Sequence, residues 1–344
     1  MARKTFRKVI TSPEMIEKIN PENKRLMKSF IKHKNAKCSD DTITNYESDL
    51  NIYFCYNLQN NENKSFIKTK KLELAEFFDY GLMELKWGGN RYSRMRSLLN
   101  SFSTFIEDYL DEDFPEFRNI VNKAVPKVPK EPVRKKTIIL EEQVYKLRNT
   151  LIEEGNIDQA MYLMLLASTG ARKSETLRIT YDIIDENYTA FGGLFLETTE
   201  DIKTKGHGKK GTMMSRFILK DTFMPMYNMW IPVRNQRLED NNKTTNALIV
   251  DKKGEPLTKA KIDTYIKHWE DILGIDLYCH AYRHFIVSEL TRKGCSSDFV
   301  IAVLKWKSSD MFKIYNDLED KDRNWKEIDK LKNTFSENSL YDIS

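Results

Sequence analysis

The chain has 344 residues, of which 40% are hydrophobic and 31% charged, and a formal net charge of +5 at neutral pH. This length is enough for two domains with their own cores, because a domain usually spans roughly 100–200 residues. No apolar run approaches the roughly 20 residues of a membrane span, and the four scattered cysteines form no CxxC pair. We therefore expect a cytoplasmic protein with no membrane partner, no disulfide framework and no zinc site.

The first part of the sequence combines helical periodicity with basic charge. Apolar residues recur every three or four positions at about 21–34, 40–54, 72–82 and 91–106, which predicts a bundle of four helices in a domain of residues 1–121. Residues 1–136 hold 26 Lys and Arg against 19 Asp and Glu, so they carry +7 while the remainder carries −2. This asymmetry suggests an anionic partner such as nucleic acid. Arg91, Arg94 and Arg96 are candidates for phosphate contact, although a solvated helix face explains each of them equally well.

Residues 122–136, NKAVPKVPKEPVRKK, are expected to form a linker. Their three prolines exclude a helix and favour extended backbone, and six basic residues face one acid. Such a connector is semi-rigid and cationic and can follow a phosphate backbone. The candidate DNA contacts are Lys130, Arg134, Lys135 and Lys136, and an ordinary solvated linker is the alternative.

Residues 137–335 are expected to form a second, mixed domain, followed by a tail of residues 336–344. Helical patterns occur at about 140–154, 157–169, 221–236, 258–273, 281–293, 297–305 and 323–333. Between the second and third of these, GGLFLETTE and SRFILK predict a hairpin with the long polar tip KTKGHGKKGTM. The predicted fold class is mainly α with a small antiparallel β-sheet.

Two segments of the second domain carry residues that suit the binding of phosphate. Arg172, in TGARKSE, follows a glycine turn and opens a helix, with Glu175 three residues later. His280 and Arg283, in HAYRH, lie three positions apart at a helix start and so project from one face. Each segment taken alone has an ordinary explanation, a surface arginine for the first and a chance match for the second.

Two further segments could supply the reacting groups. The hairpin tip offers several lysines, and a lysine beside a phosphate can protonate an alkoxide leaving group. Trp306 and Tyr315 lie nine residues apart, separated by a Ser-Ser-Asp break. A solvated loop and a core tyrosine are the ordinary explanations.

Taken in order, these segments resemble the active-site signature of the tyrosine recombinase, or phage integrase, family. That signature is an Arg in a TGxRxxE turn, a hairpin lysine, HxLRH, an LGH or LGW tripeptide, and a tyrosine nine residues later. Here TGARKSE, HAYRH, LKW and IY occur in that order, and Tyr315 lies 35 residues after His280. The helical first part, with TITNYESDL, resembles the core-binding domain of the family. Lys305 replaces the usual glycine, Tyr282 replaces the usual leucine, and Trp306 stands where histidine is commoner.

The resemblance implies a role for each matching residue. Tyr315 is the nucleophile that forms a 3′-phosphotyrosine, and Arg172 and Arg283 hold the non-bridging phosphate oxygens. His280 donates a hydrogen bond or helps to move the tyrosine proton, and Trp306 donates its indole N–H or packs the nucleophile's helix. Glu175, as a supporting residue, orients Arg172 or His280. The lysine that protonates the leaving oxygen is assigned to Lys205, with Lys203 as the alternative.

The resemblance also implies partners and limits. Double-stranded DNA attachment sites are the substrate, the active form is a tetramer on DNA, accessory DNA-bending proteins can take part, and neither metal nor other cofactor is needed. An integrase of a mobile element, such as a virus or plasmid, is the favoured role. The alternatives are an Xer-like resolvase, a telomere resolvase, a topoisomerase IB-like enzyme, or an idle DNA-binding protein of the same fold.

Overall fold

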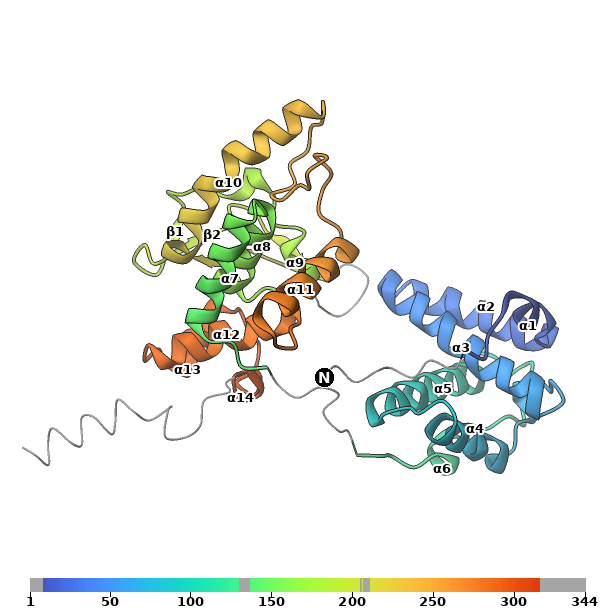
Figure 1. Ribbon diagram of the computed structural model, residues 1–344. Coiled ribbons are helices and arrows are strands. Elements are labelled where there is room, and N and C mark those ends of the chain that lie inside the picture. The colour runs from blue at the N-terminus through green and yellow to red at the C-terminus, as the bar shows by residue number, and fades with distance from the viewer. Residues whose placement is uncertain (1–8, 130–136, 205, 207–210, 316–344) are drawn as a thin grey trace, which may run out of the picture. The chain divides into compact units, whose positions relative to one another are not determined.

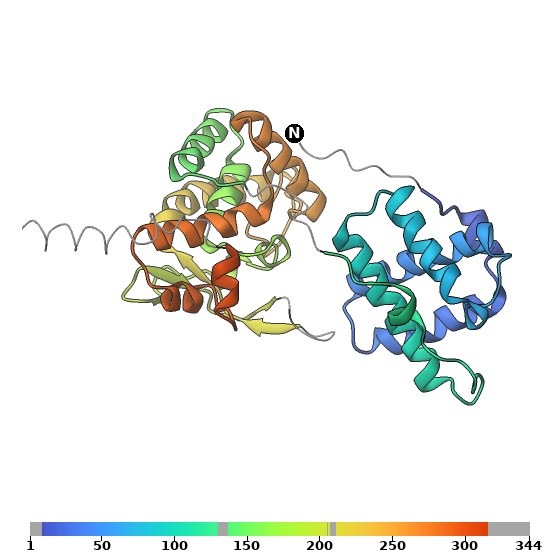
Figure 2. The same cartoon turned by 90° about the horizontal axis from the view of Figure 1, so that it is seen from below.

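The computed structural model describes residues 9–129, 137–204, 206 and 211–315. The chain forms two compact units, one built from the helices up to Ala124 and the other from the elements that begin at Glu141. Both units are shown in Figures 1 and 2. The predicted fold class, mainly α with a small antiparallel sheet, is confirmed. Within the described part of the chain, no helix is both long enough and apolar enough to cross a membrane.

The first unit is all-helical and has an aromatic core. Its elements are α1 (Pro13–Lys18), α2 (Pro21–Asn35), α3 (Asp40–Asn60), η1 (Phe66–Lys68), α4 (Lys71–Met83), α5 (Gly89–Tyr109) and α6 (Val121–Ala124). The four longer helices correspond to the four predicted segments. Phe30 of α2, Phe54 of α3 and Phe66 of η1 all meet Phe102 of α5 edge to face, an arrangement that aromatic pairs prefer.

The short helix α6 differs from the prediction for the linker. It includes residues 122–124, where the prolines led us to expect no helix, and it ends before Pro126. Val121 and Val125 are buried in the core of the first unit. The first unit therefore holds the start of the predicted linker, because these two valines supply apolar surface to bury. Residues 130–136 of the predicted linker lie outside the described residues, and the predicted domain boundaries stay predictions.

The second unit is organised around one buried helix. Its helices are α7 (Glu141–Glu153), α8 (Ile157–Thr169), α9 (Lys173–Thr176), η2 (Tyr181–Ile183), α10 (Lys220–Asp240), α11 (Lys259–Leu273), α12 (Cys279–Arg292), α13 (Ser297–Val303) and α14 (Asp310–Tyr315). The run from Ala160 to Thr169 is buried on every side, as expected of a helix that is apolar all round. Helices α7, α10 and α12 pack against α8 (Figure 1).

The strands of the second unit form two small antiparallel sheets. The first contains β1 (Thr189–Ala190), β2 (Phe195–Glu197) and β5 (Phe217–Leu219) in the order β1-β2-β5, and the second pairs β3 (Ile202–Thr204) with β4 (Thr212–Met214). The predicted pairing of GGLFLETTE with SRFILK is confirmed, with Leu196 opposite Ile218. The predicted polar tip was too long, because β3 and β4 continue the hairpin until Thr204 faces Thr212. The predicted helix at 323–333 lies outside the described residues.

Candidate active site

The Arg172 turn follows directly from the end of the buried helix α8. Gly170 ends this helix with a φ of +55°, and a Cβ there would lie 2.5 Å from Cγ2 of Ile286 on α12. Only glycine allows both the left-handed backbone and this close approach to α12. The chain then turns at Ala171, whose N–H donates to Oγ1 of Thr169 at 3.1 Å. Arg172 follows as the N-cap of the short helix α9.

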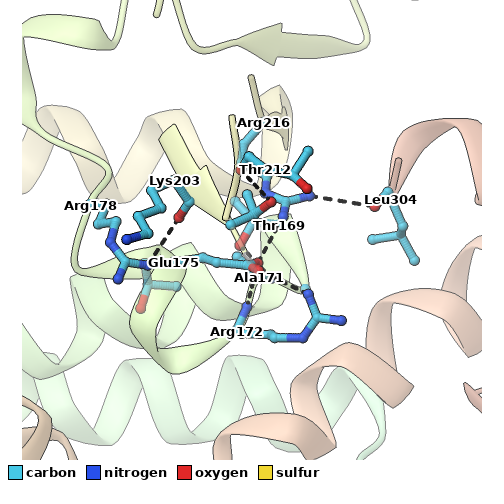
Figure 3. A network of polar contacts seen from close by, with 12 residues as sticks. Thr169, Ala171, Arg172, Glu175, Arg178, Lys203, Thr212, Arg216 and Leu304 are labelled. Atoms are coloured by element: carbon cyan, nitrogen blue, oxygen red, sulfur yellow. Dashed lines mark hydrogen bonds and ion pairs between the residues drawn. The ribbon is translucent and has the colours of Figure 1, made fainter. Parts of the chain in front are cut away.

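Glu175 is fully buried and holds Arg172 from two directions (Figure 3). Its carboxylate accepts from the backbone N–H of Arg172 at 3.1 Å and from Nη1 of the same residue at 2.9 Å. Burial by itself would raise the pKa of this carboxyl, but the charges of Arg216 and Arg172 outweigh burial and hold the pKa below its ordinary value. Glu175 is therefore ionised at neutral pH and contacts Arg172, as the expected orienting residue would.

Helix α12 brings Arg283 against the same turn. The Arg283 side chain is 1% exposed, and its Nη1 donates to the carbonyl of Gly170 at 2.9 Å. Its guanidinium lies 5.1 Å from the centre of the Trp306 ring, within the range of a cation–π contact. Arg283 thus joins the Arg172 turn to the loop that precedes α14.

His280 lies one turn before Arg283 on the same helix and keeps part of its surface exposed. Partial burial of the imidazole lowers the pKa of His280, and the nearby charges of Arg283 and Arg172 lower it further. The structure thus brings His280 close to the two cationic side chains of Arg172 and Arg283. The imidazole is neutral at neutral pH, so it can accept a proton.

The loop after α13 carries Trp306 to the same group of side chains. Lys305, which stands where the family usually has glycine, adopts the left-handed backbone with a φ of +52°. The backbone N–H of Trp306 donates to the carbonyl of Ile301 at 3.0 Å, which fixes the end of α13. Tyr315 is the last residue of α14, a helix that packs against α12 and α13. Its side chain lies outside the described part of the structure.

The two candidate lysines differ in what the structure shows of them. Lys203 is exposed on β3, and its carbonyl accepts from Nη1 of Arg178 at 3.0 Å. Lys205 lies outside the described residues. The assignment of Lys205, with Lys203 as the alternative, therefore stays a prediction.

The candidate DNA contacts of the first unit are already engaged within that unit. Arg91 and Arg94 both pair with the buried carboxylate of Asp49, at 2.5 and 3.0 Å, and Arg94 remains half exposed. Arg96 donates to the carbonyl of Val125 at 2.7 Å and to Asn122 at 2.7 Å, so it holds the start of the linker. The remaining candidates, Lys130, Arg134, Lys135 and Lys136, lie outside the described residues.

The sequence analysis did not identify Arg216, which contacts the carboxylate of Glu175. Arg216 follows β4, is only 5% exposed, and donates from Nη2 to Oε2 of Glu175 at 2.9 Å (Figure 3). The sequence did offer one signal, because Arg216 directly precedes the apolar strand residues FIL. A charged side chain beside a buried strand must either reach solvent or find a charged partner. In the described parts of the chain, no three His, Cys, Asp or Glu side chains are grouped to hold a metal ion.

The model of the phage integrase family matches residues 138–322, more than half of the chain. The chain belongs to the phage integrase family, the tyrosine recombinases. Its enzyme class, DNA strand breakage and rejoining, is that of a tyrosine recombinase. None of the curated proteins matches this sequence.

Solved structures of tyrosine recombinases share the fold. The XerH site-specific recombinase bound to palindromic difH substrate is 17% identical, with a TM-score of 0.60 over 91% of this chain and 84% of that one. The Tn1549 transposon integrase in complex with transposon right end DNA is 14% identical, with a TM-score of 0.62 over 90% and 99%. A lambda integrase tetramer bound to a Holliday junction is 15% identical, with a TM-score of 0.62 over 86% and 77%. At these identities the likeness establishes the fold.

Proposed function

We propose that this tyrosine recombinase cleaves and rejoins duplex DNA at specific sites through a phosphotyrosine on Tyr315. The observation that carries the proposal is the convergence of Arg172, His280, Arg283 and Trp306, from three separate segments, beside the helix that ends at Tyr315. Two guanidiniums stay charged and present planar donors, which suits the non-bridging oxygens where negative charge grows in the transition state.

The proposed reaction balances without an outside reagent. Oη of Tyr315 attacks the scissile phosphorus, the bond to the 5′ oxygen breaks, and the phosphate becomes esterified to the tyrosine. His280 accepts the tyrosine proton, for which its lowered pKa leaves the imidazole unprotonated. Lys205, with Lys203 as the alternative, protonates the leaving 5′ oxygen. Arginines supply the positive charge that a metal ion supplies in other phosphoryl transfers, so we propose that no metal takes part.

We further propose that the enzyme acts in the cytoplasm as a tetramer on two attachment sites and integrates or excises a mobile element. Solved relatives include a dimer on a core site and a tetramer on a Holliday junction, which supports self-association on DNA. Resolution of dimers is the second candidate, since XerH on difH has the same fold. Transfer of a tagged plasmid into a separate target site, as opposed to resolution of two directly repeated sites, distinguishes the two.

The test is covalent trapping on a nicked suicide duplex that contains the junction of the source element. Wild type is expected to form a denaturation-resistant adduct in the presence of a chelator, and Tyr315→Phe to form none while binding the duplex equally well. An adduct that persists in Tyr315→Phe would refute the assignment of the nucleophile. A bound site that gives no adduct with wild type would favour an idle DNA-binding protein.

A further inference from the structure

The backbone of Arg216 is held by two hydrogen bonds that do not involve its side chain. It lies between β4 and β5, and its backbone N–H donates to Oγ1 of Thr198 at 3.0 Å while its carbonyl accepts from the N–H of Thr198 at 2.9 Å. The side chain is thereby directed into the interior, where a charged group is costly unless it is paired and hydrogen-bonded. An arginine in such a place needs an explanation beyond solubility.

The guanidinium of Arg216 lies between two parts of the site. Nη2 donates to Glu175, the carboxylate that holds Arg172, at 2.9 Å. On the other side, Nη1 makes a longer contact of 3.5 Å with the carbonyl of Leu304, two residues before Trp306 (Figure 3). A planar guanidinium can donate in both directions at once, whereas an ammonium or an amide cannot span the same gap with fixed geometry.

A second set of contacts, made by Lys305, joins the strand residues around Arg216 to the Trp306 loop. Nζ of Lys305 lies 3.0 Å from Oε1 of Glu197 on β2 and also bonds to Oγ of Ser215, the residue before Arg216. The ammonium lies 4.3 Å from the centre of the Phe217 ring. The pair 215–216 thus contacts the pair 304–305 twice, once through the buried guanidinium and once through Lys305.

We infer that Arg216 is a positioning residue of the recombination site, which holds the Glu175–Arg172 pair and the Trp306 loop in one arrangement. Lys305 supports the same loop from the sheet. The inference rests on the proposed function, because it assigns Arg172 and Trp306 to the phosphate. Arg216 itself does not touch the substrate, so its loss slows cleavage without weakening DNA binding.

The experiment compares Arg216→Met with Arg234→Met. Arg234 is a matched control because it is equally buried, at 4%, but donates to the carbonyls of Ala247 and Thr245 away from the site. Single-turnover adduct formation is measured at saturating suicide duplex, with DNA affinity and thermal unfolding followed for each variant. Arg216→Met is expected to cleave about 100-fold more slowly than wild type, since displacement of a reacting group by about 1 Å has that effect. Arg234→Met is expected to cleave close to the wild-type rate, and both to bind DNA normally.

Two further variants separate positioning from folding. Glu175→Gln combined with Arg216→Met removes both buried charges, so it should unfold at a higher temperature than Arg216→Met and still cleave slowly, because Arg172 has lost its anchor. Lys305→Gly keeps the left-handed backbone and removes only the contacts of the Lys305 ammonium with Glu197 and Ser215. We expect it to lower the rate of cleavage about tenfold. Wild-type rates in both Arg216→Met and Lys305→Gly would overturn the inference, as would a loss in Arg216→Met that simply matches its unfolded fraction. Failure of wild type to form any adduct would instead refute the proposed function.

Discussion

The two units of the chain differ in how many charged side chains they bury and in how these are grouped. In the first, the core is a cluster of aromatic rings, and among residues 9–129 Asp49 is the one buried charged side chain. Its partners Arg91 and Arg94 reach solvent, with side chains 22% and 51% exposed. In the second, Glu175, Arg216 and Arg283 are all buried around one turn.

The difference supports the proposed location of the chemistry in the second unit. Burying a charge costs free energy that apolar packing would not, so a cluster of buried charges is a candidate functional site. Burial alone does not identify a site, because Arg234 is buried and bonds only backbone carbonyls and a neighbouring Asn in the described structure. What distinguishes the cluster in the second unit is that it fixes a partly exposed arginine, Arg172, the residue proposed to bind the phosphate.

The largest expected effect is on catalysis. Arg172→Gln should lower the rate of adduct formation by about 10²–10³-fold, the usual loss when one donor to the transition state is removed. Its thermal unfolding should change little, because Arg172 is partly exposed and Glu175 keeps its bond to Arg216. Single-turnover cleavage and thermal unfolding of the same preparation check this. A variant that cleaves at the wild-type rate would remove Arg172 from the site.

The next effect is on the stability of the second unit. Glu175→Gln leaves the guanidinium of Arg216 buried without a charged partner, and removal of one member of a buried pair usually costs about 3 kcal/mol. The free energy of unfolding in urea measures the loss. A change below 1 kcal/mol, on the order of an exposed ion pair, would show that the buried pair is not essential for folding.

The matching change in the first unit should be smaller. Asp49→Asn removes a buried carboxylate, but Arg91 and Arg94 can turn to solvent, so we expect a loss of about 1 kcal/mol in the free energy of unfolding. The same urea titration provides the measurement. A loss as large as that of Glu175→Gln would contradict the contrast between the two units.

How much of the fold and of the site could be predicted from the sequence depends on how far apart in the sequence the contacting residues lie. The amphipathic helices of the first unit and the hairpin pairing follow from local periodicity, and the Arg172 turn follows from a glycine that must adopt a positive φ. Arg216 could not be assigned, because its partner Glu175 is 41 residues away and neither residue reveals its burial locally. Lys305 departs from the usual glycine, and only the structure shows that it keeps the left-handed backbone and adds a tie to the sheet.

The smallest expected effect concerns pH. The pKa of His280 in the folded state lies below its unfolded value of about 6.5, so the unfolded state binds the proton more readily. The contribution of His280 to the free energy of unfolding is therefore present above about pH 6.5 and is lost as the pH falls through the folded pKa. The cleavage rate should fall over the same acidic range as the imidazole becomes protonated. His280→Gln should lower the rate and remove this acid limb, measured by single-turnover cleavage between pH 5 and 8. An acid limb that is unchanged in His280→Gln would assign the titration to another group.

The most direct test of the central claim is to identify the amino acid that carries the DNA. Trapped adduct would be digested with nuclease and protease, and the peptide that retains a nucleotide would be sequenced by mass spectrometry. We predict a single modified peptide in which the 3′-phosphate is esterified to Tyr315. A nucleotide found on any other residue would contradict the proposed mechanism, since the cluster of Arg172, His280 and Arg283 would then serve a different nucleophile.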